Sequence, residues 1–289
     1  MKKFLILCIL STVFGYQSSS QSLSDYYPST LGELVEHTYY TLDYNEEHEQ
    51  ANWVIYFAGN FGSAKRSDNF RSDDEVDTES ATLDDYAGSG YDRGHLAPAA
   101  DMNLNSTAMS ESFYLSNMSP QVPGFNRGIW KKLEALTRDW SALYDSPWDV
   151  IVTGPVLDKS CGKIGTNVSV PCRYYKIYAN LETLKAIAFL LPNESSKKEL
   201  SEFVVAIDDL EAITGIDFFY LLDDAKEAQF ESTVTTTGWD WDPKVTITPT
   251  PSEPTPNTTS AQCKGTTQSG KRCSRKAGAS GYCWQHEEH

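Results

Sequence analysis

The chain has 289 residues, enough for one large domain or two smaller ones with a sizeable buried core. Its formal net charge is −16, and residues 4–243 alone hold 16 basic and 37 acidic groups. Because acidic groups outnumber basic groups, the overall electrostatic field of the protein repels a polyanion. This excludes strong, salt-resistant binding of a polyanion through that field. Any nucleic-acid chemistry here needs a local basic patch and a metal ion.

The amino-terminal segment has the order of residues found in a secretory signal peptide. Two lysines precede an apolar run over residues 4–14, and small and polar residues follow. The run is too short to span a bilayer, so the pattern predicts a signal peptide over residues 1–21. No other stretch is apolar enough to cross a membrane. We therefore expect a protein with no membrane association after signal removal, in a secreted or periplasmic location.

Strand-like and helix-like segments intermix through the next part of the chain. Runs of β-branched and aromatic residues predict strands at 52–58, 148–154, 173–179 and 184–191, with a shorter candidate at 112–118. Apolar residues at helical spacing predict one helix from about Asn126 and a second over 196–215, the latter opened by a serine and closed by a glycine.

The irregular order of these elements indicates the fold class. Strands and helices do not alternate regularly, which argues against a doubly wound parallel sheet. We expect an α+β domain with a mixed, largely antiparallel central sheet flanked by helices.

Composition divides the chain into four parts. Residues 1–21 are the predicted signal peptide, and we expect residues 22–243 to form one domain. Residues 244–261 are rich in Pro and Thr and predict an extended linker, and residues 262–289 form a small basic Cys/His module.

Two cysteines of the domain lie close together in the sequence. Cys161 and Cys172 bracket a loop that contains Gly and Pro, so its ends could close. We predict a disulfide between them, and two buried thiols are the alternative.

The stretch "YDRGHLAPAADM" at residues 91–102 carries the densest chemistry in the sequence. Hydrolysis of a phosphodiester needs a base for water, a hard cation and cationic donors for the phosphate. His95 can be the base, because its ordinary pKa lies near neutrality. Arg93 and Arg66 can hold phosphate oxygens through their planar guanidinium groups.

The predicted helix near Asn126 supplies groups for the cation. Asn126, Trp130 and Glu134 are four residues apart and form a slowly drifting stripe on a helix. The amide oxygen of Asn126 suits Mg²⁺, although an Asn at a helix start can also be only a cap. Glu134 can hold a water of the ion, and Trp130 is more typical of packing than of base stacking.

The two aspartates of the 91–102 stretch have two possible roles. Asp92 and Asp101 could ligate a metal, but a solvated surface role is an equal alternative for each. We include neither in the predicted site.

Three motifs in order, "DRGHLAPAADM", "SNMSPQ" and "FNRGIWKKLE", resemble the DNA/RNA non-specific endonucleases, secreted nucleases with a ββα-metal active site. The resemblance covers about residues 50–243. It implies a hairpin that carries His95, crossed by a helix that brings Asn126 to the metal. It also implies hydrolysis that leaves 5′-phosphate ends.

The resemblance also implies a role for each matched residue. His95 would be the general base, Asn126 the direct protein ligand of Mg²⁺, or of Mn²⁺ or Ca²⁺, and Glu134 a partner of the ion through water. The remaining matches are Arg93 as the arginine of the histidine motif, Asn117 as a supporting amide, and Arg66 as a phosphate-binding arginine with Arg71 as its alternative.

The carboxy-terminal module has a possible metal-binding pattern of its own. Three thiolates and an imidazole suit a tetrahedral structural zinc ion. The alternative is oxidative, with two cysteines paired and the third free. The candidate zinc ligands are Cys263, Cys273, Cys283 and His286.

These features together predict an exported, metal-dependent endonuclease that hydrolyses DNA and RNA with little sequence preference. Two alternatives stay open: a phosphodiesterase acting on a smaller ester, and a catalytically silent nucleic-acid-binding protein. The sequence identifies no protein partner.

Overall fold

The computed structural model describes residues 22–59, 61–144, 149–231, 234–246 and 264. The predicted signal peptide, most of the predicted linker and the candidate zinc ligands Cys263, Cys273, Cys283 and His286 lie outside these ranges.

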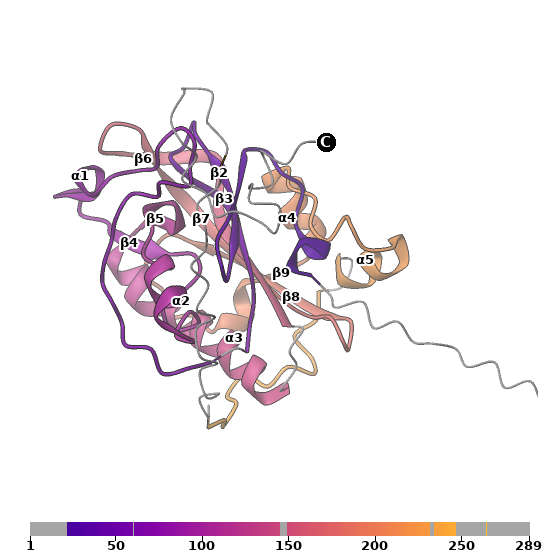
Figure 1. Cartoon of the computed structure of the whole chain (residues 1–289). Coiled ribbons are helices and arrows are strands. Elements are labelled where there is room, and N and C mark those ends of the chain that lie inside the picture. Colours follow the sequence, from indigo (N-terminus) through magenta and orange to yellow (C-terminus); the bar gives the residue numbers. More distant parts are fainter. Residues whose placement is uncertain (1–21, 60, 145–148, 232–233, 247–263, 265–289) are drawn as a thin grey trace, which may run out of the picture.

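A seven-stranded sheet forms the centre of the described domain (Figure 1), with the strand order β1-β2-β3-β6-β7-β8-β9. Every neighbouring pair in it is antiparallel. The strands are β1 (Glu33–Glu36), β2 (Thr41–Asn45), β3 (Gln50–Phe57), β6 (Asp149–Ile164), β7 (Val168–Asn180), β8 (Lys185–Pro192) and β9 (Val204–Val205).

Both faces of this sheet are covered, and β3 and β7 are buried along most of their length. On one face, α3 (Lys131–Tyr144) packs Leu133 and Trp140 onto the sheet. On the other face, α4 (Ile207–Thr214) and α5 (Asp224–Glu231) cover a second core cluster. The layers are helix, sheet and helix, as Figure 1 shows.

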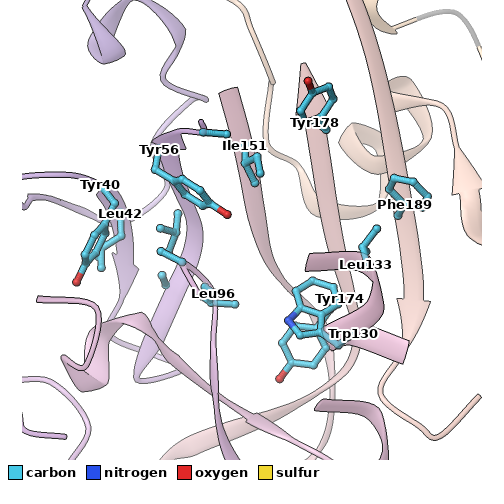
Figure 2. Packing of buried hydrophobic residues seen from close by; sticks show 14 of the residues in the cluster. Tyr40, Leu42, Tyr56, Leu96, Trp130, Leu133, Ile151, Tyr174, Tyr178 and Phe189 are labelled. Atoms are coloured by element: carbon cyan, nitrogen blue, oxygen red, sulfur yellow. The ribbon is translucent and has the colours of Figure 1, made fainter. Parts of the chain in front are cut away.

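A small ββα unit lies on the α3 side of the sheet. Strands β4 (Asp92–His95) and β5 (Met118–Gln121) pair antiparallel, with His95 opposite Met118. The π-helical turn η3 (Phe125–Trp130) follows β5 and leads directly into α3. Leu96, which follows β4, belongs to the same buried cluster as Trp130 and Leu133 (Figure 2).

Short helices complete the described part of the chain. They are η1 (Leu23–Tyr26), α1 (Leu83–Tyr86), α2 (Ser106–Glu111), η2 (Leu115–Asn117) and η4 (Leu200–Phe203).

The predicted fold class is confirmed, and the four main predicted strands correspond to β3, β6, β7 and β8. The short strand predicted at 112–118 is wrong. The Asn105 side chain accepts hydrogen bonds from Thr107 and Ala108, both at 3.0 Å, and starts α2 just before it. Helix α2 ends at Glu111, and Leu115–Asn117 then form the 3-10 turn η2, in which the N–H of Asn117 donates to the carbonyl of Tyr114 at 3.1 Å. The strand β5 begins only at Met118.

The helix predicted over 196–215 is wrong in its first half. Val204 and Val205 pair with β8, and helix α4 begins at Ile207. The predicted end is correct, because Gly215 adopts a left-handed φ of 73° at the helix terminus. No helix in the described ranges is both long and apolar enough to span a bilayer.

The structure joins Cys161 and Cys172 in a disulfide at a sequence separation of 11 residues. Replacing both cysteines by serine should lower the free energy of unfolding by about 3 kcal/mol, because a cross-link restricts the unfolded chain. Urea unfolding followed by tryptophan fluorescence measures this loss. Wild-type protein treated with a reductant is the control and should unfold like the variant. An unchanged midpoint in both would contradict a stabilising role.

Candidate active site

His95 ends strand β4 and lies against two aromatic rings that also contact each other. Its ring centroid is 4.9 Å from that of Phe113, edge to face, and 5.8 Å from that of Phe70. Its Nε2 is buried and makes no hydrogen bond within the described residues. Burial lowers the pKa of His95 to about 3, and the nearby guanidinium groups of Arg66 and Arg93 add to the lowering. The imidazole is therefore neutral at pH 7 in this structure.

The same two aromatic rings carry two arginines. The guanidinium carbon of Arg93 lies 4.1 Å from the ring centroid of Phe70, and that of Arg66 lies 4.8 Å from that of Phe113. Cation–π contact positions both groups while their side chains stay exposed to solvent. Phe70 and Phe113 thus form a shared platform under His95 and the two cations.

Arg71, the alternative to Arg66, is directed elsewhere. Its Nη1 donates to the carbonyl oxygens of Ser110 at 2.9 Å and Asn69 at 3.2 Å, and its guanidinium lies over Tyr114 at 3.8 Å. These contacts commit Nη1 of Arg71 to backbone carbonyls. Arg66 pairs through Nε with the exposed Asp68 at 2.6 Å, and its contact with the Phe113 ring places it beside His95, which favours Arg66 as the phosphate ligand.

Asn117 fixes the chain immediately after His95. Its side-chain oxygen accepts from the backbone N–H of Ala97 at 2.8 Å, and its Nδ2 donates to the carbonyls of Ala97 at 3.0 Å and Ser112 at 2.9 Å. The backbone carbonyl of Asn117 also accepts from the N–H of Leu96 at 3.0 Å. A fully buried amide therefore holds the loop that follows the imidazole.

Asn126 is tied to strand β4 by a carboxylate. Its Nδ2 donates to Oδ2 of Asp92 at 2.9 Å, and Nε of Arg127 donates to the same oxygen at 2.8 Å. Burial alone would raise the pKa of Asp92, but the hydrogen bonds from Arg127 and Asn126 outweigh it and lower that pKa. Because the amide nitrogen is committed to Asp92, the amide oxygen is the atom left for a cation.

The local helix geometry differs from the regular stripe that the spacing predicts. Gly128 has φ −108° and ψ −109°, and the turn around it is π-helical. Asn126 lies before Gly128, and Gly124 rather than Asn126 occupies the N-cap position of this turn. Trp130 and Glu134 lie after Gly128. Trp130 is fully buried against Phe125 and Tyr174, which confirms packing as its role.

Glu134 belongs to a group of charged side chains between α3 and the sheet. Burial raises its pKa, against the opposing charge of Lys176. Nε of Arg138, one turn further along α3, donates to Asp101 at 2.6 Å, and Asp101 also accepts from the hydroxyl of Tyr56 at 2.7 Å. Asp101 is thus a buried partner of Arg138 rather than a solvated surface residue.

The chemistry of the predicted ligands fits a hard divalent cation. The amide oxygen of Asn126 in η3 and the carboxylate of Glu134 in α3 are ligands of the kind that Mg²⁺ and similar ions prefer. Sequence reasoning did not find the contacts of Asp92, Phe113 and Lys176. Asp92 carried a signal, since it belongs to the "DRGH" motif itself, but the contacts of Phe113 and Lys176 depend on the fold.

If Asp92 orients the Asn126 amide, the D92A variant should bind Mn²⁺ about 10–100-fold more weakly, because groups that orient a ligand contribute to metal affinity. Calorimetric titration of Mn²⁺ without substrate measures this. The matched control is R127A, which removes an exposed partner of Asp92 and keeps the Asn126 hydrogen bond. It should change the affinity no more than about fivefold. Equal losses in the two variants would refute the orienting role.

Comparison with known proteins places the chain among nucleases. Nuclease C1 of Cunninghamella echinulata var. echinulata is 33% identical over 68% of this chain and 86% of its own length. A mitochondrial nuclease of Saccharomyces cerevisiae is 35% identical over 70% of each chain. The crystal structure of an EndoG/EndoGI complex, described as showing the mechanism of EndoG inhibition, matches with a TM-score of 0.62 at 28% identity, covering 71% of this chain and 92% of that one.

These relatives contradict the predicted secreted or periplasmic location. The yeast nuclease is named mitochondrial, and so is Nuclease EXOG of mouse and of human, at 32% and 33% identity. The prediction used only the charge and hydropathy of the amino-terminal segment. These two properties do not specify the compartment to which a protein is sent, so the predicted location was wrong.

Family models account for most of the sequence. Residues 260–289 match a domain of unknown function (DUF5763), which overlaps the predicted Cys/His module. Residues 18–225 match the DNA/RNA non-specific endonuclease model. The chain therefore belongs to the DNA/RNA non-specific endonuclease family, whose members are hydrolases of nucleic acids.

Proposed function

We propose that this nuclease cleaves DNA and RNA with Mg²⁺ as its ion and leaves 5′-phosphate ends, with His95 as general base and Asn126 as the direct metal ligand. The observation that carries the proposal is the hydrogen bond between Asp92 and Asn126. It joins the strand that ends in His95 to the helical turn that presents the amide.

The residues that would hold the cation are Asn126, through its amide oxygen, and Glu134, through water. A bound divalent cation supplies positive charge that offsets the charge developing on the phosphate. The chain itself contributes hard oxygen donors here, which favours Mg²⁺, with Mn²⁺ or Ca²⁺ as substitutes.

His95 is suited to removing the proton of the attacking water. Its Nε2 is enclosed, so Nδ1 is the nitrogen left to face the substrate. A neutral imidazole packed beside aromatic rings keeps its orientation and has an unprotonated ring nitrogen that can take the proton of water. The contacts of Asn117 with the following loop support this placement.

Arg66 and Arg93 are placed to hold the scissile phosphate. Both guanidinium groups are exposed and lie on the Phe70 and Phe113 platform beside His95. They supply the local positive patch that a domain with an excess of acidic groups requires.

The proposed reaction follows from these positions. The water oxygen bonds to phosphorus while its proton passes to His95. The bond from phosphorus to the 3′ oxygen breaks, and that oxygen takes a proton from solvent. The phosphate stays on the 5′ side of the next nucleotide.

Replacing His95 by alanine should lower kcat on supercoiled plasmid and on RNA by about 10²–10⁴-fold, since a positioned general base contributes about that factor. Gel assays with Mg²⁺ at saturating substrate measure it, and chelation should abolish wild-type cleavage. Mn²⁺ affinity serves as the control and should be unchanged in H95A. Full activity in that variant would exclude His95 as the base.

The same assay discriminates between the alternatives. Hydrolysis of a small phosphodiester without cleavage of plasmid or RNA would indicate an enzyme acting on smaller esters. Binding of nucleic acid with no cleavage under any divalent ion would indicate a silent binding protein.

The two candidate phosphate ligands are separated by a matched pair of variants. R66A should reduce kcat/KM by about 10-fold or more, because a charge-assisted contact with phosphate contributes about 1.5–3 kcal/mol. R71A removes contacts with Ser110, Asn69 and the Tyr114 ring, so its main effect should be on thermal stability. Activity lost in R71A and kept in R66A would reverse the assignment.

A further inference from the structure

The chain crosses from one face of the central sheet to the other after helix α5. Phe230, near the end of α5, belongs to the core cluster on the side of α4 and α5. Trp239 is buried in the cluster on the opposite side, which α3 covers. The end of the domain therefore lies on the face that carries η3 and α3. We call this the catalytic face, because Asn126 and Glu134 belong to these two elements.

Residues 239–243, which we call the strap, are fastened to α3 by aromatic side chains. The ring centroid of Trp239 lies 4.7 Å from that of Trp140, and that of Trp241 lies 5.8 Å from it. Nε1 of Trp140 donates to the backbone carbonyl of Asp240 at 2.6 Å. These contacts fix the place where the predicted linker begins.

The strap ends beside the start of α3. Trp241 and Pro243 line a cleft of about 510 Å³ together with Ile129. Ile129 belongs to the turn η3 and follows Asn126 by less than one helical turn. The predicted linker therefore starts on the same helical segment as the proposed metal ligand.

The sequence joined to this place has the opposite charge balance from the domain. Residues 22–243 hold 16 basic and 37 acidic groups, whereas residues 262–289 hold five basic and two acidic groups. Lysine and arginine neutralise phosphates irrespective of the base sequence, and this interaction supplies most of the non-specific affinity of proteins for nucleic acid. A domain whose overall charge repels a polyanion is thus followed by a module that attracts one.

The length of the tether sets where the module can act. At no more than about 3.6 Å per residue, the linker over residues 244–261 spans at most about 65 Å. Because base pairs are about 3.4 Å apart, this reach equals about 20 base pairs. A substrate that extends beyond the active site can be contacted by both parts of the chain. Tethering makes the second contact intramolecular, with an effective concentration on the order of millimolar.

We propose that the basic module over residues 262–289 is a second, sequence-independent binding site for the phosphates of nucleic acid, and that the strap holds its tether on the catalytic face. The module retains a long substrate while the active site cleaves it. Residues 260–289 match a domain of unknown function. This inference rests on the proposed function only for the place of the active site.

The test measures DNA binding by the full-length protein in EDTA, where cleavage does not interfere, through the fluorescence anisotropy of a labelled duplex of about 40 base pairs. Neutralising the five basic residues of the module should weaken binding about 10–100-fold at low salt. The dependence of log Kd on log salt should become shallower by about 2–4, since each phosphate contact contributes about 0.9. The substitutions are K264Q, K271Q, R272Q, R275Q and K276Q.

Cleavage of a short oligonucleotide by the same variant should keep the wild-type kcat and KM, because such a substrate does not reach the module. Unchanged affinity for the long duplex, with an unchanged salt dependence, would overturn the proposal. So would binding of the module to vesicles of anionic lipid together with no contribution to DNA binding.

A matched pair of variants separates the module from net charge. K271Q/R272Q removes two charges from the module, and K185Q/K226Q removes two exposed lysines beside and on α5. The first should weaken binding of the long duplex several-fold, and the second less than about twofold, because charges remote from the bound phosphates are screened by salt. Equal losses would show an effect of net charge alone and would overturn the proposal.

The strap is tested by W239A/W241A, in the full chain with the basic module and in the full chain with the module neutralised. Releasing the strap lengthens the tether back to α5, and effective concentration falls as about the −3/2 power of length, so binding should weaken about twofold or more. The neutralised chain should show no further loss. Equal losses in both chains would contradict the role of the strap.

The short oligonucleotide reports whether the strap variant is folded, and W241A alone provides the same comparison if the double variant is not. Failure of the proposed function is distinct. A wild-type protein that binds DNA through the module and cleaves nothing with Mg²⁺ would contradict the proposed function alone.

Discussion

The hydrogen bond from Asn126 to Asp92 is the constraint on which the rest of the site depends. Strand β4 and the turn η3 are separated by three intervening elements, α2, η2 and β5, and this contact fixes one against the other. It also commits the amide nitrogen, so that the amide oxygen is left for a cation. The packing of Leu96 against Trp130 and Leu133 supports the same junction with apolar contacts.

Two different environments meet at this junction. On the outer side, aromatic rings carry His95, Arg66 and Arg93, where cation–π contact leaves the guanidinium groups exposed to substrate. On the inner side, Glu134 and Lys176 lie in the low-dielectric space between α3 and the sheet, where charges interact strongly. An accessible cationic surface thus lies on one side and buried charged groups lie on the other.

The sequence predicted most residues of the candidate site, but it predicted few of the contacts between them. His95, Asn126 and Glu134 follow from motif order, and the main strands follow from β-branched and aromatic runs. The role of Asp92 depends on its contact with Asn126 in a distant turn, which local patterns do not encode. The predictions for residues 112–118 and 196–205 failed for a related reason, because the turn η2 and the pairing of β9 with β8 override the apolar pattern.

The central claim is that the Asn126 amide oxygen and the Glu134 carboxylate serve one cation beside His95. A crystal structure with Mn²⁺, located by its anomalous scattering, tests this most directly. The account predicts a peak about 2.1–2.2 Å from Oδ1 of Asn126, with Glu134 reaching the ion through water. A peak bound elsewhere in the domain, with Asn126 and Glu134 both without contact to it, would contradict the account.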